Sequence, residues 1–179
     1  MPGEVDYTNL FELAAMPIPE LRDQAWTPLA HPFIPNEGTA IFSAIQAGDI
    51  LVHHPYDSFD ASVEHFISTA ADDPSTVSIK MTAYRIGDDT PFVKSLIRAA
   101  EHGKQVACVM EIKARFDEER NLHWATELER VGAHVTFGVT GLKTHAKTAL
   151  VVRKESGGLR CYAHIVTGNY HVKTARLLR

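Results

Sequence analysis

A chain of 179 residues, 45% apolar and 22% charged, is long enough for one globular domain with a packed core, which excludes a disordered protein. Its formal charge of −4 argues against a protein that wraps nucleic acid, because such proteins normally carry a basic surplus. Without an apolar run of membrane-span length or a leader, and with Cys108 and Cys161 predicted to be reduced core residues, the sequence indicates a cytoplasmic protein.

Residues 1–40 differ from the rest, because prolines interrupt them and leave room for one short helix near Leu10–Ala15. We interpret them as a lead-in from a preceding region. The elements predicted after them are a helix over Ile41–Gln46, a strand over Asp49–Val52, a helix from Asp57 or Ser58 to about Ala71, a strand over Val77–Tyr84, a helix from Pro91 to Gly103, a strand over Val106–Ile112, a helix over Glu118–Val131, strands over Ala133–Phe137, Thr148–Arg153 and Leu159–Val166, and a helix from Thr174.

Strands that alternate with helices and then form a hairpin predict an α/β fold with a mixed β-sheet flanked by helices on both faces. The nearly continuous apolar run Val106–Ile112 is typical of a strand buried on both faces. In the helix over Glu118–Val131, helical spacing places five residues on the inward face: Leu122, Trp124, Ala125, Leu128 and Val131.

The segment Gly141–Leu150 contains a His-x-Lys pair, His145 and Lys147. Side chains two residues apart on an extended segment project to the same face, so one face would present an imidazole nucleophile and an ammonium group that binds a phosphate oxygen. A neutral imidazole nitrogen is nucleophilic near neutral pH, where a serine hydroxyl would need a base. The pair therefore indicates phosphoryl transfer or cleavage of a phosphodiester.

Two arginines follow predicted strands, Arg85 after Val77–Tyr84 and Arg115 after Val106–Ile112. Ligands of open α/β sheets bind beyond the carboxyl ends of the strands, and guanidinium groups bind phosphate in a bidentate manner. Each arginine alone is equally well explained as solvated, but together with the His-x-Lys pair they favour one phosphate pocket. We expect the side-chain ends of His145, both arginines and Asn169 to lie about 4–8 Å apart.

Three further groups leave alternatives open. Asn169, after the hairpin strand, could orient an imidazole or donate to a phosphate oxygen, or it could simply cap the next helix. The adjacent His53 and His54 point opposite ways on an extended chain, which favours a structural or substrate-orienting role over metal binding. One carboxylate could orient His145; the candidates are Glu111, Asp117, Glu118 and Glu119, of which the last two are typical first-turn acids of a helix.

The chain resembles class-1 polyphosphate kinases from about Val5 to its end, in five stretches in the same order. These are His53–Phe59, Ile79–Arg85, Glu111–Glu118, Gly141–Lys147, and Thr167–Tyr170 followed by Lys173–Leu177. The resemblance implies a phospholipase D-like fold. It also implies that residues 1–40 lead in from the preceding head domain and that residues 41–179 form the first C-terminal catalytic domain, apparently truncated at its C-terminus.

For the site, the resemblance implies that His145 is autophosphorylated by ATP and passes the phosphoryl group reversibly to inorganic polyphosphate. Arg85 and Arg115 match positions associated with phosphate and Mg²⁺; since arginine is always cationic, they would lie in the vicinity of the metal and not ligate it. With Lys147 they would neutralise charge on the transferring group. The parent protein is expected to bind ATP or ADP and polyphosphate, no nucleic acid, and to form a homo-oligomer.

The chain departs from the family at Val166, where glycine is usual, at His171, where asparagine is usual, and at Leu178, where a nucleotide-contacting tyrosine is usual. Two alternatives to the kinase stay open. One is a phospholipase D-like phosphodiesterase, against which the negative charge and the single His-x-Lys copy argue. The other is an anion-binding fragment that is inactive alone, because the second catalytic domain is absent.

Overall fold

The computed structural model describes Tyr7 and residues 10–22, 26–84, 91–111, 118–138, 141–142 and 144–170. The helix predicted from Thr174, and the family departures His171 and Leu178, lie outside these residues. The short helix predicted near the N-terminus is confirmed as α1 (Leu10–Ala15), all of whose residues are exposed, and a 3₁₀ turn follows at Pro19–Leu21. None of the described helices is long and apolar enough to cross a bilayer.

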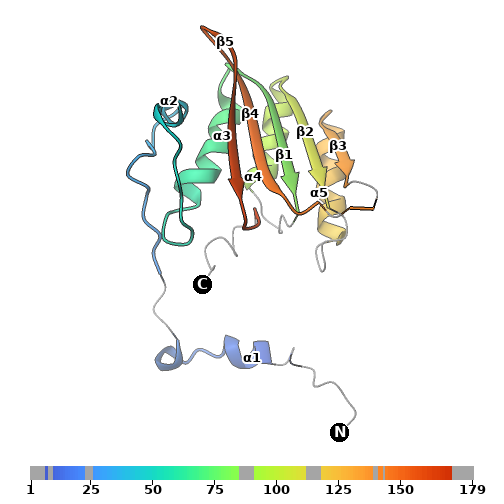
Figure 1. The fold of residues 1–179 in the computed structure, drawn as a ribbon. Coiled ribbons are helices and arrows are strands. Elements are labelled where there is room, and N and C mark those ends of the chain that lie inside the picture. Colours follow the sequence, from blue (N-terminus) through green and yellow to red (C-terminus); the bar gives the residue numbers. More distant parts are fainter. Residues whose placement is uncertain are drawn as a thin grey trace.

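A five-stranded sheet in the order β3-β2-β1-β4-β5 forms the centre of the fold (Figure 1). Strands β1 (Thr76–Ala83), β2 (Gln105–Met110) and β3 (His134–Phe137) are parallel. The hairpin of β4 (Lys147–Glu155) and β5 (Gly158–Val166) joins β1 in antiparallel orientation. The predicted mixed α/β sheet is therefore confirmed.

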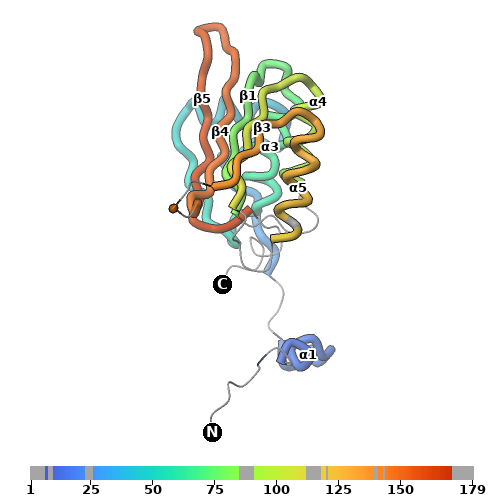
Figure 2. Tube along the Cα trace, turned by 90° about the vertical axis from the view of Figure 1, so that its right-hand side faces the viewer, coloured from blue at the N-terminus to red at the C-terminus, as the bar shows by residue number. Residues whose placement is uncertain are grey.

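Three helices, α3 (His65–Asp72), α4 (Pro91–Glu101) and α5 (Glu118–Arg130), lie together on one face of the sheet (Figure 2). The order of strands and helices in the sequence predicted helices on both faces. Helices α4 and α5 share a face because each connects neighbouring parallel strands, and such crossovers have the same hand. Helix α3 precedes β1 and packs against α4 on that face. A π-helical turn, Asp60–Glu64, leads into α3, and α2 (Ala40–Ala47) packs near β5 through ring contacts of Phe42 with Phe66 and Tyr162.

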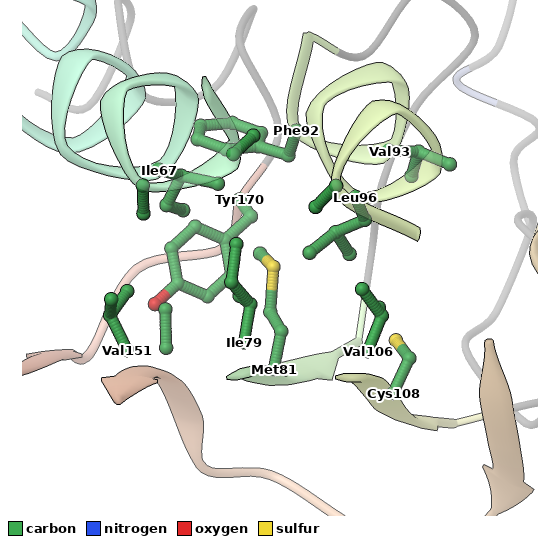
Figure 3. Close-up of a cluster of buried hydrophobic side chains, with 14 of the residues drawn as sticks. Ile67, Ile79, Met81, Phe92, Val93, Leu96, Val106, Cys108, Val151 and Tyr170 are labelled. Atoms are coloured by element: carbon green, nitrogen blue, oxygen red, sulfur yellow. The ribbon is translucent and has the colours of Figure 1, made fainter. Parts of the chain in front are cut away.

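The hydrophobic core lies between the sheet and these helices (Figure 3). Its members include Ile79 and Met81 of β1, Val106 and Cys108 of β2, Ile67 of α3, Phe92 and Leu96 of α4, Val151 of β4 and Tyr170. Strand β2 alternates between buried and half-buried residues, so the expectation of burial on both faces is wrong. The reason is that α3, α4 and α5 cover only the face to which Val106 and Cys108 point.

Three local predictions are also wrong. Residues 49–52 form no strand, since they pair with no other segment, and Leu51 is 88% exposed. In α5 the inward stripe is Asn121, Ala125 and Leu128, whereas Leu122 is 55% exposed because it is turned about 100° from Asn121 around the helix. Cys108 is buried as predicted, but Cys161 is exposed.

Candidate active site

Each of the five strands has one end near the His-x-Lys pair, and these five ends lie at the same edge of the sheet. Parallel strands β1, β2 and β3 end there, antiparallel β4 begins there, and β5 ends there. The residues that leave the strands at this edge include Tyr84, Glu111, Gly138, His145 and Asn169. Segments distant in the sequence thus meet beyond the carboxyl ends of the parallel strands, where ligands of open α/β sheets bind.

Tyr84 lies against both members of the pair. The rings of Tyr84 and His145 are 5.4 Å apart at an interplanar angle of 69°, and Lys147 Nζ lies 4.9 Å from the centroid of the Tyr84 ring. His145 is exposed, whereas Lys147 is only 2% exposed. Both side chains therefore contact one ring, although His145 precedes β4 and only Lys147 belongs to the strand. The ring thus packs beside an accessible imidazole and a buried cation.

Of the four candidate carboxylates, Glu111 lies beside the His145 segment. Its side chain is buried, and Oε2 accepts a hydrogen bond from the backbone N–H of Thr144 at 2.9 Å. Gly138, at φ +60°, lies close by, since a Cβ at this position would be 3.8 Å from Thr144 Oγ1 and 3.9 Å from Glu111 Oε2. Glu111 therefore holds the backbone of the residue before His145 by a hydrogen bond. Glu118 and Glu119 lie in the first turn of α5 as expected, and Asp117 is outside the described residues.

Asn121 links α5 by hydrogen bonds to the residues that follow β1 and β2. Its side-chain amide donates to the carbonyl oxygen of Tyr84 at 3.0 Å and to that of Glu111 at 2.9 Å, and the residue is 1% exposed. Glu111 N in turn donates to Ala83 O at 3.0 Å. Sequence reasoning missed Asn121, although a polar residue one helical turn before Ala125 on the apolar stripe was an available signal. It also missed Tyr84 and Thr82, whose hydroxyl bonds to Ala146 O and Thr148 N, because the sequence held no clear signal for either residue.

The Thr167–Tyr170 turn is anchored in the core at its far end. Tyr170 is 2% exposed, its ring lies 5.4 Å from that of Phe92, and its hydroxyl is 2.9 Å from His164 Nδ1. Strand β5 pairs with β4, with Val166 opposite Lys147, so the turn follows directly on the partner of the His-x-Lys strand. Within the described part of the chain, Asn169 Oδ1 is buried and has no hydrogen-bond partner, and the residues that Asn169 would cap lie outside that part.

Two half-buried histidines, His54 and His164, lie near this turn. Burial, and the charge of the neighbouring His54, lower the pKa of His164 from 6.5 to about 4, so its ring is neutral near pH 7. Burial likewise raises the pKa of Tyr170 far above its usual value, which keeps its hydroxyl protonated. His54 Nδ1 lies 2.9 Å from Asp57 O, and its ring packs on Phe59 at 5.0 Å. These contacts support a structural role for His54.

The caps and turns around the site follow the sequence in part. Ser58, one of the two predicted caps, accepts the backbone N–H of Ala61 at 3.1 Å. Asp57, the other, instead accepts a hydrogen bond from the backbone N–H of His53 at 2.6 Å.

Among the described residues, no three His, Cys, Asp or Glu side chains gather to hold a metal ion. Arg85 and Arg115 lie outside the described residues, so their distances to His145 remain predictions.

Comparison with known proteins gives one family. The family model for "Polyphosphate kinase C-terminal domain 1" matches residues 40–179. Polyphosphate kinases from Mycobacterium tuberculosis (strain H37Rv) and Mycobacterium marinum are each 51% identical to the chain over 179 residues, 99% of its length. The crystal structure of polyphosphate kinase from Porphyromonas gingivalis superposes with a TM-score of 0.75 and 35% identity over 95% of the chain.

This chain therefore belongs to the polyphosphate kinase family. It spans 24% of the length of the mycobacterial relatives and 29% of the Porphyromonas gingivalis chain.

Proposed function

We propose that this chain carries the phosphoryl-accepting histidine of a polyphosphate kinase and that this residue is His145. The observation that supports it best is the contact of exposed His145 and buried Lys147 with the same Tyr84 ring, at the edge where the strands end. An accessible imidazole can attack phosphorus, while a fixed cation beside it can bind a phosphate oxygen. The family to which the chain belongs makes a phosphoryl group the natural ligand of such a pair.

The reaction we propose has two steps. A nitrogen of the His145 imidazole attacks the γ-phosphorus of ATP, the bond from that phosphorus to the bridging oxygen breaks, and ADP leaves. A terminal oxygen of polyphosphate then attacks the phosphohistidine, the N–P bond breaks, and the chain is longer by one phosphate. Lys147, with Arg85, Arg115 and Asn169, would neutralise or orient the transferring group, since positioning and charge stabilisation dominate such catalysis.

Magnesium would come to this site with the nucleotide. Mg²⁺ prefers oxygen ligands and usually keeps waters and substrate phosphates in its coordination shell. The described residues hold no cluster of three candidate ligands, and the nearby carboxylate, Glu111, already accepts the Thr144 N–H. We therefore propose MgATP as the substrate and assign no protein ligand to the metal. The 179 residues alone are proposed to be inactive, since they span 24% of relatives named polyphosphate kinase.

The test is phosphorylation of the full-length parent with ATP labelled at the γ-phosphate. We expect acid-labile, base-stable label on wild type and its complete loss in His145→Ala. His134→Ala is the matched control, because His134 is an exposed histidine on β3, and it should label like wild type. Label that survives His145→Ala would refute the assignment. Release of alcohol or nucleotide from a diester without ATP would favour the phosphodiesterase instead.

A further inference from the structure

The backbone pairing between β1 and β4 stops just before the His-x-Lys pair. Its register runs from Thr76 opposite Arg153 to Met81 opposite Ala149, and it goes no further. In a continuing antiparallel ladder, the next backbone groups of β4, Ala146 C=O and Thr148 N–H, would pair with the backbone of β1. The strands instead separate where the candidate nucleophile begins.

The hydroxyl of Thr82 takes the place of this missing pairing. Thr82 Oγ1 donates to Ala146 O at 2.6 Å and accepts from Thr148 N at 2.9 Å. One side chain of β1 therefore holds both backbone groups that flank Lys147. Because a hydroxyl can donate and accept at once, threonine satisfies both groups at this position, and an apolar residue of the same shape would satisfy neither.

The other side of His145 is also held by a side chain. Glu111 Oε2 accepts the N–H of Thr144, and Glu111 is fixed at the end of β2 by its own backbone bonds to Ala83 and Asn121. The main chain is thus held at Thr144, immediately before His145, and at Ala146, immediately after it. Neither contact uses the imidazole itself, which stays exposed.

We propose that Thr82 is a positioning residue for the phosphoryl transfer assigned to His145: its hydroxyl replaces the end of the β1–β4 ladder and fixes the backbone on which His145 and Lys147 are carried. The inference rests on the proposed function. A small displacement of a reacting group can slow a reaction roughly 100-fold, so this contact governs rate more than substrate affinity.

The experiment uses the full-length parent and a matched set of substitutions. Thr82→Val removes the hydroxyl and keeps the shape, and Thr82→Ser keeps the hydroxyl. Thr136→Val makes the same exchange at an exposed threonine on β3. We expect Thr82→Val to lower the rate of His145 phosphorylation and kcat roughly 10- to 100-fold with little change in KM for ATP. Thr82→Ser and Thr136→Val should stay within about threefold of wild type.

Hydrogen exchange in the same proteins separates positioning from a general loss of structure. In Thr82→Val the segment 144–150 should exchange faster, while core strand β2 stays protected as in wild type. If the valine variant does not accumulate, Thr82→Ala makes the same comparison.

Wild-type phosphorylation with an unchanged rate in Thr82→Val would overturn the inference and leave the proposed function intact. Slow phosphorylation of His145 in Thr82→Ser would also overturn it, since loss of the hydroxyl would then not explain the lower rate. If wild type carries no phosphate on His145, the proposed function fails; unchanged exchange at 144–150 would then overturn the backbone contact separately.

Discussion

His164 should make the stability of this domain fall as the solution is acidified from pH 7 to pH 4. Its half-buried ring packs against Tyr170, and partial burial together with His54 lowers its pKa to about 4, whereas an unfolded chain gives histidine a pKa of 6.5. Between these values the unfolded chain binds a proton that the folded protein does not. The contribution of the neutral ring is therefore complete above pH 6.5 and is lost as the pH falls toward 4.

The size of the effect follows from the same two values. The difference between 6.5 and about 4 corresponds to about 3 kcal/mol of unfolding free energy, a large part of the 5–15 kcal/mol typical of a domain. We expect His164→Gln, which cannot titrate and can still bond to the Tyr170 hydroxyl, to remove about this much of the pH dependence. The exchange lowers stability at pH 7, but the loss relative to wild type should shrink on acidification.

Urea unfolding at several pH values between 7 and 4, followed by the fluorescence of Trp124 on α5, measures the effect. His134→Gln is the control, because His134 is exposed, and its curve should run parallel to that of wild type. Parallel curves for wild type and His164→Gln would refute the reasoning. So would an NMR titration in which the His164 ring protonates near pH 6.5 while the protein is still folded.

Three other outcomes follow from the site and the core. Asn121→Leu leaves the carbonyl oxygens of Tyr84 and Glu111 without their amide partner. The free energy of unfolding in urea should therefore fall by roughly 2–4 kcal/mol. A decrease below about 1 kcal/mol would contradict the structural role of these two hydrogen bonds. Tyr84→Phe keeps an aromatic ring beside Lys147, whereas Tyr84→Leu removes it. In a single-turnover assay, His145 should therefore be phosphorylated faster in Tyr84→Phe than in Tyr84→Leu. Iodoacetamide at pH 8 should label exposed Cys161 and spare Cys108, whose pKa burial raises to about 12, and mass spectrometry would show the reverse if this assignment is wrong.

The elements of the fold were readable from local patterns, because each depends on residues close in the sequence. Helices α4 and α5 begin and end near Pro91, Gly103, Glu118 and Gly132, where the sequence places their start and stop signals. The mixed sheet followed from the order of strands and helices. The residues 49–52 show the limit of such reasoning, since an apolar run becomes a strand only where another strand is available to pair with it.

His145 and Lys147 could be named from the sequence because their spacing alone predicts that they project to one face of an extended segment. The sequence could not identify Thr82 and Tyr84 as their neighbours, since these lie on β1 and directly after it and reach the pair only through the sheet register. Nor could it identify Asn121, which reaches the Tyr84 carbonyl oxygen from α5. Register and the choice of helix-covered face are decided by packing among distant segments, and no local pattern encodes them. The sequence by itself therefore predicted the candidate nucleophile, and the tertiary structure decided which residues hold the backbone on either side of it.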